Sequence, residues 1–442
     1  MSATRNLAEF VSTLNIKNIP ADVIAAAKIS FCDWLAVAVA GAREGEIEGL
    51  LKVAGIMGGN EQATVIGRKV KTSALYATLI NGMSSHTLDF DDTSKEFLGH
   101  TSVTVFPCSL AIGEWKKLSG ADFLTAYIAG FETGCRVGLG ASPNHYVKGW
   151  HATSTIGRFA AAAAAGRALR LNSSQLVFAL GTAGTQAGGL QKVFGTSCKP
   201  FHAGKAGFDG FLSALLAKEG FSSIDNILEG EKCFWDMYSA DWSEQKAEEG
   251  LGSIWYLPEN IFKFHASCHF THASIDAVLT LKERHGFDAE KIEQIEVTVP
   301  SQVVEIAGKK TPTQALEGKF SLPYTVANAL IREDTGLAAF TDEKVNDKKV
   351  TALRDKVTMI VDETVASFES DVKIKTSGET YHCRLSLFDR KMAFAEKKKA
   401  IEVKFKSLAG PILGAEKTAR LMGQIDALEQ VSDITEITDL IG

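Results

Sequence analysis

The chain has 442 residues, which is more than one hydrophobic core usually contains, so we expect two domains. Apolar residues make up 45% and charged residues 23%, proportions that are typical of a globular protein and exclude a disordered chain. The net charge is −6 and the basic residues are spread along the sequence, so nothing indicates a nucleic-acid or membrane surface. An anionic substrate would need a local cationic pocket.

The cysteines indicate reduced thiols. Their number is odd and no pair forms a CxxC motif, which argues for a cytoplasmic protein and against a zinc or iron–sulfur site. The seven positions are Cys32, Cys108, Cys135, Cys198, Cys233, Cys268 and Cys383. The first residues, MSATRNLAEFVSTLN, lack the apolar core of a signal peptide. The uncharged run 171–191 is too polar to span a bilayer.

The first third of the chain predicts mainly helices. Pro20 opens a helix with very little polar surface, which should be buried. A short strand is predicted over 63–67 (ATVIG), and a helix over 72–85. Pro107 interrupts the next apolar segment near its start, a position that a first-turn proline permits.

Helix signals continue to about residue 260. Ser119 and Asp122 resemble a capping box for a helix over 121–137. The polyalanine run 160–165 lets helices approach closely, and Asn172 with Ser173 offers an N-cap for the next helix. This part of the chain is therefore predicted to be a nearly all-helical domain.

The pattern changes near Pro300. KIEQIEVTV before it, and later VKIKTSG and TYHCRLSLF on either side of a Ser-Gly turn, alternate as strands do. The segment 401–405 is either a last strand or a return connection, and LMGQIDALEQ is helical again. The predicted fold is mainly α with a second α+β domain. We place the helical domain at 1–262, completed by about 400–442, and the α+β domain at 263–399.

The richest stretch in polar side chains is NGMSSHTLDFDDTSKEFLGHTSVTVFPC, residues 81–108. Asp89, Asp91 and Asp92 lie almost side by side, and His100 follows seven residues after Thr93 without an apolar face that would need it for packing. Proton chemistry is one interpretation. An acidic solvated loop with a capping aspartate is an equally simple one.

A second stretch, 149–207, places His151 and Lys199 in polar, glycine-rich surroundings. Together the two stretches resemble the MmgE/PrpD family, which includes 2-methylcitrate dehydratase, cis-aconitate decarboxylase and iminodisuccinate epimerase. The resemblance covers nearly the whole chain. It rests on six blocks in the right order: NGMSSHTLDFDDT, the GH at 99–100, GWHATSTIG, CKPFHAGKAG, SCHFTHASIDA and FSLPY.

The resemblance implies roles for individual residues. His100 and His151 would transfer protons, Lys199 would bind a carboxylate, and Tyr324 would give a hydrogen bond or relay a proton. Asp89 and Thr93 would line the pocket. The residues alone leave other roles open, because His151 could cap a helix, Lys199 could be a surface lysine and Tyr324 could be a core residue. The resemblance further implies a homodimer built through the helical domain, and an α+β part that forms a lid over the site.

The cluster His265, Cys268, His269 and His272 has spacings typical of zinc ligands. We reject a metal there because the family that the chain resembles uses none, and we expect neither a metal nor an organic cofactor. Cys268 and His269 are instead expected to bind substrate. Cys268 stands where the decarboxylase branch has a histidine, and Thr101 where the family more often has proline. The departure at Cys268 weakens an assignment to the decarboxylase branch.

Dehydration of a small polycarboxylic acid needs a base for carbon, an acid for the departing hydroxyl and cationic groups for the carboxylates. Decarboxylation of an unsaturated acid needs much the same set. The leading prediction is a metal-independent lyase of the 2-methylcitrate dehydratase type acting on a small di- or tricarboxylic acid. The alternatives are cis-aconitate decarboxylase, iminodisuccinate epimerase and a non-catalytic binding protein on the same scaffold.

Overall fold

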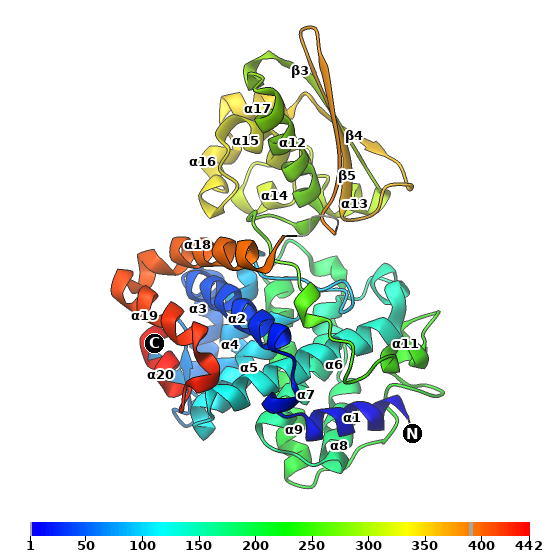
Figure 1. Ribbon diagram of the computed structural model, residues 1–442, viewed down its shortest axis with the longest axis vertical. Helices are drawn as coiled ribbons and strands as arrows, with labels where there is room; N and C mark the ends of the chain where they lie inside the picture. Colours follow the sequence, from blue (N-terminus) through cyan, green and yellow to red (C-terminus); the bar gives the residue numbers. More distant parts are fainter. Residues whose placement is uncertain (1, 389–391) are drawn as a thin grey trace. The chain divides into compact units, whose positions relative to one another are not determined.

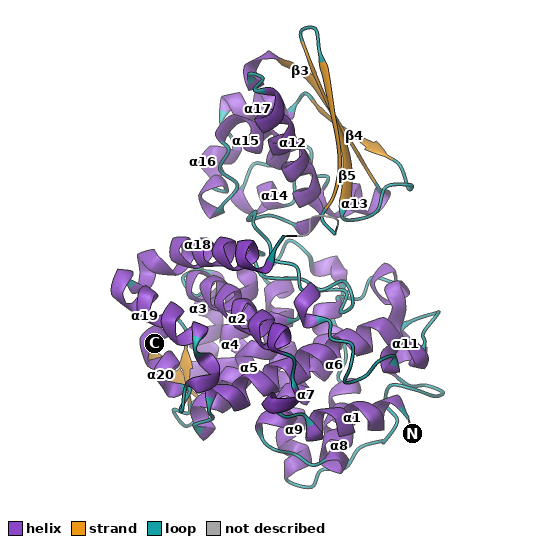
Figure 2. Cartoon of the chain, viewed as in Figure 1, coloured by secondary structure: helices purple, strands orange, loops and turns teal. Residues whose placement is uncertain are grey.

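The computed structural model describes residues 2–388 and 392–442, which form two compact units (Figure 1). Unit 1 contains the chain up to Phe262 together with Lys398–Gly442, and unit 2 contains Lys263–Lys397. Unit 1 is helical apart from a short antiparallel pair, β1 (Ala63–Val65) and β2 (Val70–Thr72), whereas unit 2 combines helices with a four-stranded sheet (Figure 2). The predicted fold class, mainly α with an α+β part, is confirmed.

Unit 1 consists of helices in the following order: α1 (Ala3–Thr13), α2 (Ala21–Gly41), α3 (Glu46–Met57), α4 (Ala74–Thr87), α5 (Ser102–Lys116), α6 (Gly120–Val147), α7 (Ala152–Ala168), α8 (Ser173–Gly184), α9 (Cys198–Lys218), α10 (Phe234–Tyr238), α11 (Glu244–Glu248), α18 (Phe394–Leu413), α19 (Ala415–Asp426) and α20 (Thr435–Ile441). The caps expected from the sequence are present. Ser119 accepts a hydrogen bond from the Asp122 amide at the start of α6, and Asn172 forms a capping box with Gln175 at the start of α8.

Helix α2 is the apolar helix that Pro20 precedes. It is long and apolar enough to cross a membrane, the one such helix among the described residues, but 78% of its most apolar stretch is buried inside the unit. The rings of Phe31 and Trp34 contact the ring of Phe106 of α5 in tilted arrangements, so this helix forms part of an aromatic core. Its composition is therefore explained by burial, as the sequence predicted.

Small residues bring α4, α7 and α9 close together. A Cβ atom on Gly204 of α9 would lie 2.1 Å from the Leu79 carbonyl oxygen of α4, and one on Gly82 would lie 2.5 Å from the Gly204 Cα. The alanines 160–165 of α7 are all fully buried, and α7 packs against α6 and α9. These contacts fix the relative positions of helices whose ends lie beside the site described below.

Two helices differ from the prediction. Pro107 is not in the first turn of a helix but inside α5, which begins at Ser102. A proline there removes one backbone hydrogen bond, yet α5 continues because every residue from Ser102 to Glu114 is buried and packing outweighs propensity. Helix α6 extends to Val147 rather than 137, with non-helical backbone angles at Ser142 immediately before Pro143.

Unit 2 begins with α12 (His272–His285) and β3 (Ile292–Val299). It continues through α13 (Ser301–Ala307), α14 (Ala315–Lys319), α15 (Leu322–Arg332), α16 (Asp342–Val345) and α17 (Lys348–Arg354) to β4 (Val357–Val361), β5 (Glu369–Thr376) and β6 (Thr380–Ser386). The sheet order is β4-β3-β5-β6, parallel between β3 and β4 and otherwise antiparallel. The hairpin predicted around the Ser-Gly turn is β5–β6.

The last part of the chain corrects one alternative. Residues 401–405 are not a strand, because they lie within helix α18, with which the chain returns to unit 1. Its buried residues have the three- and four-residue spacing of one helix face: Ile401, Lys404, Phe405, Leu408 and Ala409. A lysine at a buried position on a helix face is unusual, and Lys404 has specific partners within unit 1.

Candidate active site

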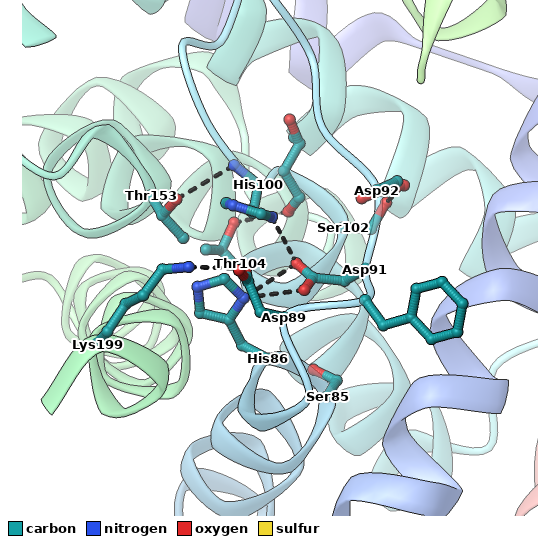
Figure 3. A network of polar contacts seen from close by, with 12 residues as sticks. Ser85, His86, Asp89, Asp91, Asp92, His100, Ser102, Thr104, Thr153 and Lys199 are labelled. Atoms are coloured by element: carbon teal, nitrogen blue, oxygen red, sulfur yellow. Dashed lines mark hydrogen bonds and ion pairs between the residues drawn. The ribbon is translucent and has the colours of Figure 1, made fainter. Parts of the chain in front are cut away.

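The centre of the site in unit 1 is Asp91, which faces two histidines (Figure 3). His86 Nδ1 lies 3.0 Å from both oxygens of the Asp91 carboxylate, and His100 Nδ1 lies 2.8 Å from Oδ2. The centroids of the two imidazole rings are 4.4 Å apart. His86 is in the last turn of α4, and His100 immediately precedes α5 with its amide donating to Thr153 Oγ1 at 3.1 Å. One loop, 88–101, therefore joins both histidines to one carboxylate.

Asp91 and Asp92 are neighbours in sequence, but the pKa of Asp91 is lowered and the pKa of Asp92 is raised. Burial raises the pKa of Asp91, but His100 and His86 together outweigh this effect and hold that pKa well below its usual value. Burial, followed by the nearby Asp33, instead raises the pKa of Asp92 to about 7. Asp91 is thus an ionised acceptor, so His86 donates to it through Nδ1–H. His86 Nε2 has no hydrogen-bond partner among the described residues.

His151 belongs to the same cluster. It occupies the N-cap position of α7, but its side chain makes no capping hydrogen bond. Its Nδ1 instead lies 3.0 Å from Nδ1 of His202 on α9, and its ring centroid is 6.1 Å from that of His86. Burial first, and then His86 and Lys199, hold the pKa of His151 well below its usual value. Burial and Arg158 lower the pKa of His202 to about 4. Two neutral imidazoles therefore share one hydrogen bond.

Lys199 completes the cluster from the first turn of α9. Its ammonium lies 2.7 Å from Asp89 Oδ1, and both side chains are nearly buried. The same ammonium lies 5.4 Å from the centroid of the Phe194 ring, whose edge also contacts His151. Asp89 has a positive φ of 51°, an uncommon conformation that aspartate tolerates better than most residues. Lys199 is thus a nearly buried lysine paired with Asp89 and not a surface lysine.

The structure brings together four of the residues named from the sequence, His100, His151, Lys199 and Asp89. Thr93 lies in the same loop, where its backbone pairs with Ile261. The sequence analysis did not assign His86, Asp91 or His202. All three lie within the quoted blocks, and His202 follows Lys199 by three residues on one helix, a spacing that places both on one face.

The remaining named residues lie in unit 2. Tyr324 is fully buried at the start of α15, and its hydroxyl donates to the Ala339 carbonyl at 2.6 Å. Cys268 and His269 are buried just before α12, where the His269 ring contacts His272 and Phe368. The roles assigned to these three residues stay predictions.

The histidine cluster that precedes α12 is hydrogen-bonded within the protein. His265 Nδ1 lies 2.6 Å from Thr335 Oγ1 and its Nε2 lies 3.1 Å from Asp276 Oδ1. His272 Nε2 lies 3.1 Å from the Ser267 carbonyl oxygen, to which it donates. His265 and His272 therefore each have a hydrogen-bond partner within the protein.

A different group in unit 1 could hold a metal ion. His86, Asp89, Asp91 and His100 each offer one ligand atom, and these atoms lie within 4.8 Å of one another. The two carboxylates already face a lysine ammonium and two imidazoles, so a cation would compete with these partners. The expectation of a metal-free site stays a prediction that a chelator can test.

Comparison of the sequence with models of protein families identifies the family of this chain. Residues 5–246 match the MmgE/PrpD N-terminal domain, and residues 265–430 match the MmgE/PrpD C-terminal domain. The chain belongs to the MmgE/PrpD family. The resemblance stated from the six sequence blocks is therefore confirmed, and the cluster in unit 1 lies entirely within the N-terminal match.

Named relatives within the MmgE/PrpD family have two kinds of activity. Cis-aconitate decarboxylase of Aspergillus terreus is 26% identical, with 99% of this chain and 95% of that protein covered. Cis-aconitate decarboxylase of Mus musculus is also 26% identical, covering 100% of this chain and 93% of that protein. 2-Methylcitrate dehydratase of Salmonella typhimurium is 27% identical over 36% of this chain and 34% of that protein. Both activities are lyase reactions on small carboxylic acids, so the family supports a lyase.

Proposed function

We propose that this MmgE/PrpD protein is a lyase that acts on a small di- or tricarboxylic acid and moves protons through histidine. The observation that supports this most directly is the convergence of His86, His100, His151 and Lys199 around Asp91 and Asp89. A polycarboxylate needs a cation to bind it and basic and acidic groups to move its protons, and these side chains supply both.

Within the proposed reaction, His151 acts as the base. If its Nδ1–H donates to His202, its Nε2 has a free lone pair, and the low pKa of the ring keeps it neutral near pH 7, which is the protonation state that a base requires. Lys199 binds a substrate carboxylate through its ammonium. It also stabilises the negative charge that spreads onto that carboxylate when the neighbouring carbon loses its proton.

His100 acts as the acid in this proposal. The ionised Asp91 carboxylate lies 2.8 Å from His100 Nδ1 and stabilises the protonated form of this imidazole. In that form His100 can donate a proton. In a dehydration the carbon–hydrogen bond breaks toward His151, the carbon–oxygen bond breaks, and the departing hydroxyl takes the proton of His100 to leave as water. This is the 2-methylcitrate dehydratase type of reaction, which we propose first because Cys268 replaces the histidine of the decarboxylase branch.

Decarboxylation is the second candidate, and the full-length similarity to cis-aconitate decarboxylases favours it. There the carbon–carbon bond breaks, carbon dioxide leaves, and the resulting carbanion takes a proton from one of the histidines. Iminodisuccinate epimerisation would use the same groups to remove a proton and return it to the opposite face. These proton transfers need no group from Tyr324, Cys268 or His269.

Proton NMR separates these reactions. Purified protein is incubated in deuterated water with 2-methylcitrate, cis-aconitate, iminodisuccinate and related acids, with and without a strong chelator. Loss of water, loss of carbon dioxide and deuterium exchange without net change give distinct spectra. We expect turnover of one polycarboxylate that the chelator does not affect. No turnover of any acid would contradict a lyase, and activity that the chelator abolishes and a metal restores would make His86, Asp89, Asp91 and His100 metal ligands.

A further inference from the structure

A buried lysine from the last part of the chain contacts the loop of the candidate site. Lys404 of α18 lies 2.6 Å from the carboxylate of Asp33 on α2, and its ammonium donates to the Phe90 carbonyl, also at 2.6 Å. The ammonium lies 4.0 Å from the centroid of the Phe90 ring. Only 5% of the Lys404 side chain and 1% of the Asp33 side chain are exposed. Phe90 stands between Asp89 and Asp91, the two carboxylates of the site.

The residue on the other side of Asp91 is also fixed from within the core. Asp92 Oδ2 accepts hydrogen bonds from Ser102 Oγ and, at 2.6 Å, from Asn260 Nδ2. Ser102 is in turn 2.8 Å from the Tyr127 hydroxyl. Figure 3 shows Asp92 beside Ser102, whereas Asp89 and Asp91 face Lys199 and the histidines. The loop is therefore held at Phe90 and at Asp92, and Asp91 lies between these two points.

We propose that Lys404 is a positioning residue for the candidate active site, because it fixes the backbone between the two carboxylates that face Lys199, His86 and His100. The proposal rests on the function proposed above for these residues. A lysine and an aspartate lose their hydration when they are buried, and apolar side chains of similar size often stabilise a fold as well or better. The carbonyl of Phe90 is a partner that an apolar side chain could not bind.

The consequence is a dependence of catalysis on a residue that does not touch the substrate. Without the Lys404 ammonium the Phe90 carbonyl loses its donor, the loop can shift, and the distances from Asp91 to the two imidazoles change. A misplacement of about 1 Å in an active site can cost on the order of 100-fold in rate. Substrate affinity should change less, because Lys199, the proposed anchor for a substrate carboxylate, is on α9 and not on this loop.

Four variants test this. Lys404→Met removes the charge and the donors but leaves an apolar chain of similar length. The double variant Asp33→Asn with Lys404→Met also removes the carboxylate that would otherwise remain buried without its cation, so that folding is preserved. Lys404→Arg keeps a charge and donors. Lys406→Met is the matched control, because Lys406 is exposed on the same helix.

We expect the double variant to fold with a melting temperature near that of the parent, while its kcat falls about 10- to 100-fold and its KM changes by less than about threefold. Lys404→Arg should retain most of the turnover, and Lys406→Met should match the parent. The second readout is independent of the reaction. In protein labelled with ¹⁵N-histidine, the imidazole signals of His86 and His100 should shift in the double variant and not in Lys406→Met.

A folded double variant with parental kcat and parental imidazole signals would overturn the proposal. If the parent protein turns over none of the acids tested, the proposed function fails, and the imidazole signals alone then decide whether Lys404 positions the loop.

Discussion

At the scale of single residues, His151 and Lys199 should differ in what their loss does to the reaction. His151→Ala removes the proposed base, and proton-transfer residues typically contribute about 10²- to 10⁴-fold in rate, so kcat should fall with a modest change in KM. Lys199→Ala removes the proposed carboxylate anchor and should raise KM more clearly. Steady-state kinetics on the identified substrate, with circular dichroism as a check of folding, measures both.

The control for this pair is His285→Ala, which removes an exposed histidine from the end of α12 and should leave both constants unchanged. Near-normal turnover by a folded His151→Ala protein would show that another group is the base. The neighbouring His202 would then be the first residue to replace.

The free energy of unfolding should depend on pH through His145. His145 is fully buried, its Nε2 lies 2.7 Å from Thr155 Oγ1, and burial lowers its pKa from 6.5 to about 4. Between these two values the unfolded chain binds a proton that the folded chain does not, so the free energy of unfolding rises with pH by about 1.4 kcal/mol per unit from this group. This contribution is fully present above about pH 6.5 and is lost on acidification toward pH 4.

Replacing His145 with Gln isolates the effect, because the glutamine amide can still reach Thr155 but does not titrate. We expect urea unfolding between pH 7 and pH 4.5 to give a shallower dependence on pH for His145→Gln than for the parent. The comparison uses the slopes, since Asp92 and Glu132, whose pKa values are raised to about 7, act in the opposite direction in both proteins. Parallel curves for the two proteins would show that His145 does not titrate as proposed.

At the scale of helices, the crossing of α4 and α9 should control stability and activity together. A methyl group on Gly204 would meet the Leu79 carbonyl at 2.1 Å, so Gly204→Ala must push the two helices apart. Overpacking of this kind typically costs about 1–3 kcal/mol. Since α4 carries His86 in its last turn and α9 carries Lys199 and His202, we expect a lower melting temperature and a lower kcat in the same variant.

Gly55→Ala is the matched control for this element. Gly55 also lies within a helix, α3, but an added Cβ would meet nothing within 4 Å. Alanine there should stabilise the protein by about 0.5–1 kcal/mol and leave kcat unchanged. Full activity and full stability of Gly204→Ala would mean that the close approach of α4 and α9 is not required.

At the scale of the whole molecule, we predict a homodimer formed through unit 1. The small residues of α7 do not form this interface, because the alanines 160–165 are buried inside the unit. The prediction now rests on the family and on an exposed apolar surface of α3, where Val53, Ile56 and Met57 are 49%, 83% and 64% exposed.

Light scattering at micromolar concentration should give twice the mass of the chain. Ile56→Glu should shift the protein toward the monomer, whereas Val361→Glu, an equivalent change at an exposed valine of unit 2, should not. A monomer mass for the parent protein at this concentration would contradict the prediction, and a dimer unaffected by Ile56→Glu would place the interface elsewhere.

The sequence by itself determined the features that depend on neighbouring residues. The caps at Ser119 and Asn172 mark helix starts because a side-chain oxygen and an amide three residues later satisfy each other locally. The hairpin β5–β6 follows from period-two alternation around a Ser-Gly turn. The family followed from six short blocks, and with it came four residues of the candidate site.

Only the tertiary structure decided the features that depend on distant residues. Pro107 lies inside a helix because packing on all sides outweighs its propensity, and the short exposed strand β4 forms by pairing with β3, which its own sequence did not indicate. The Asp91 carboxylate lies beside two histidines, His151 contacts a histidine 51 residues away, and Lys404 contacts a carbonyl 314 residues away. Local steric effects and hydrogen bonds depend on residues that are adjacent in the sequence. The contacts between distant residues form only after buried helices have packed and excluded water from the charges between them.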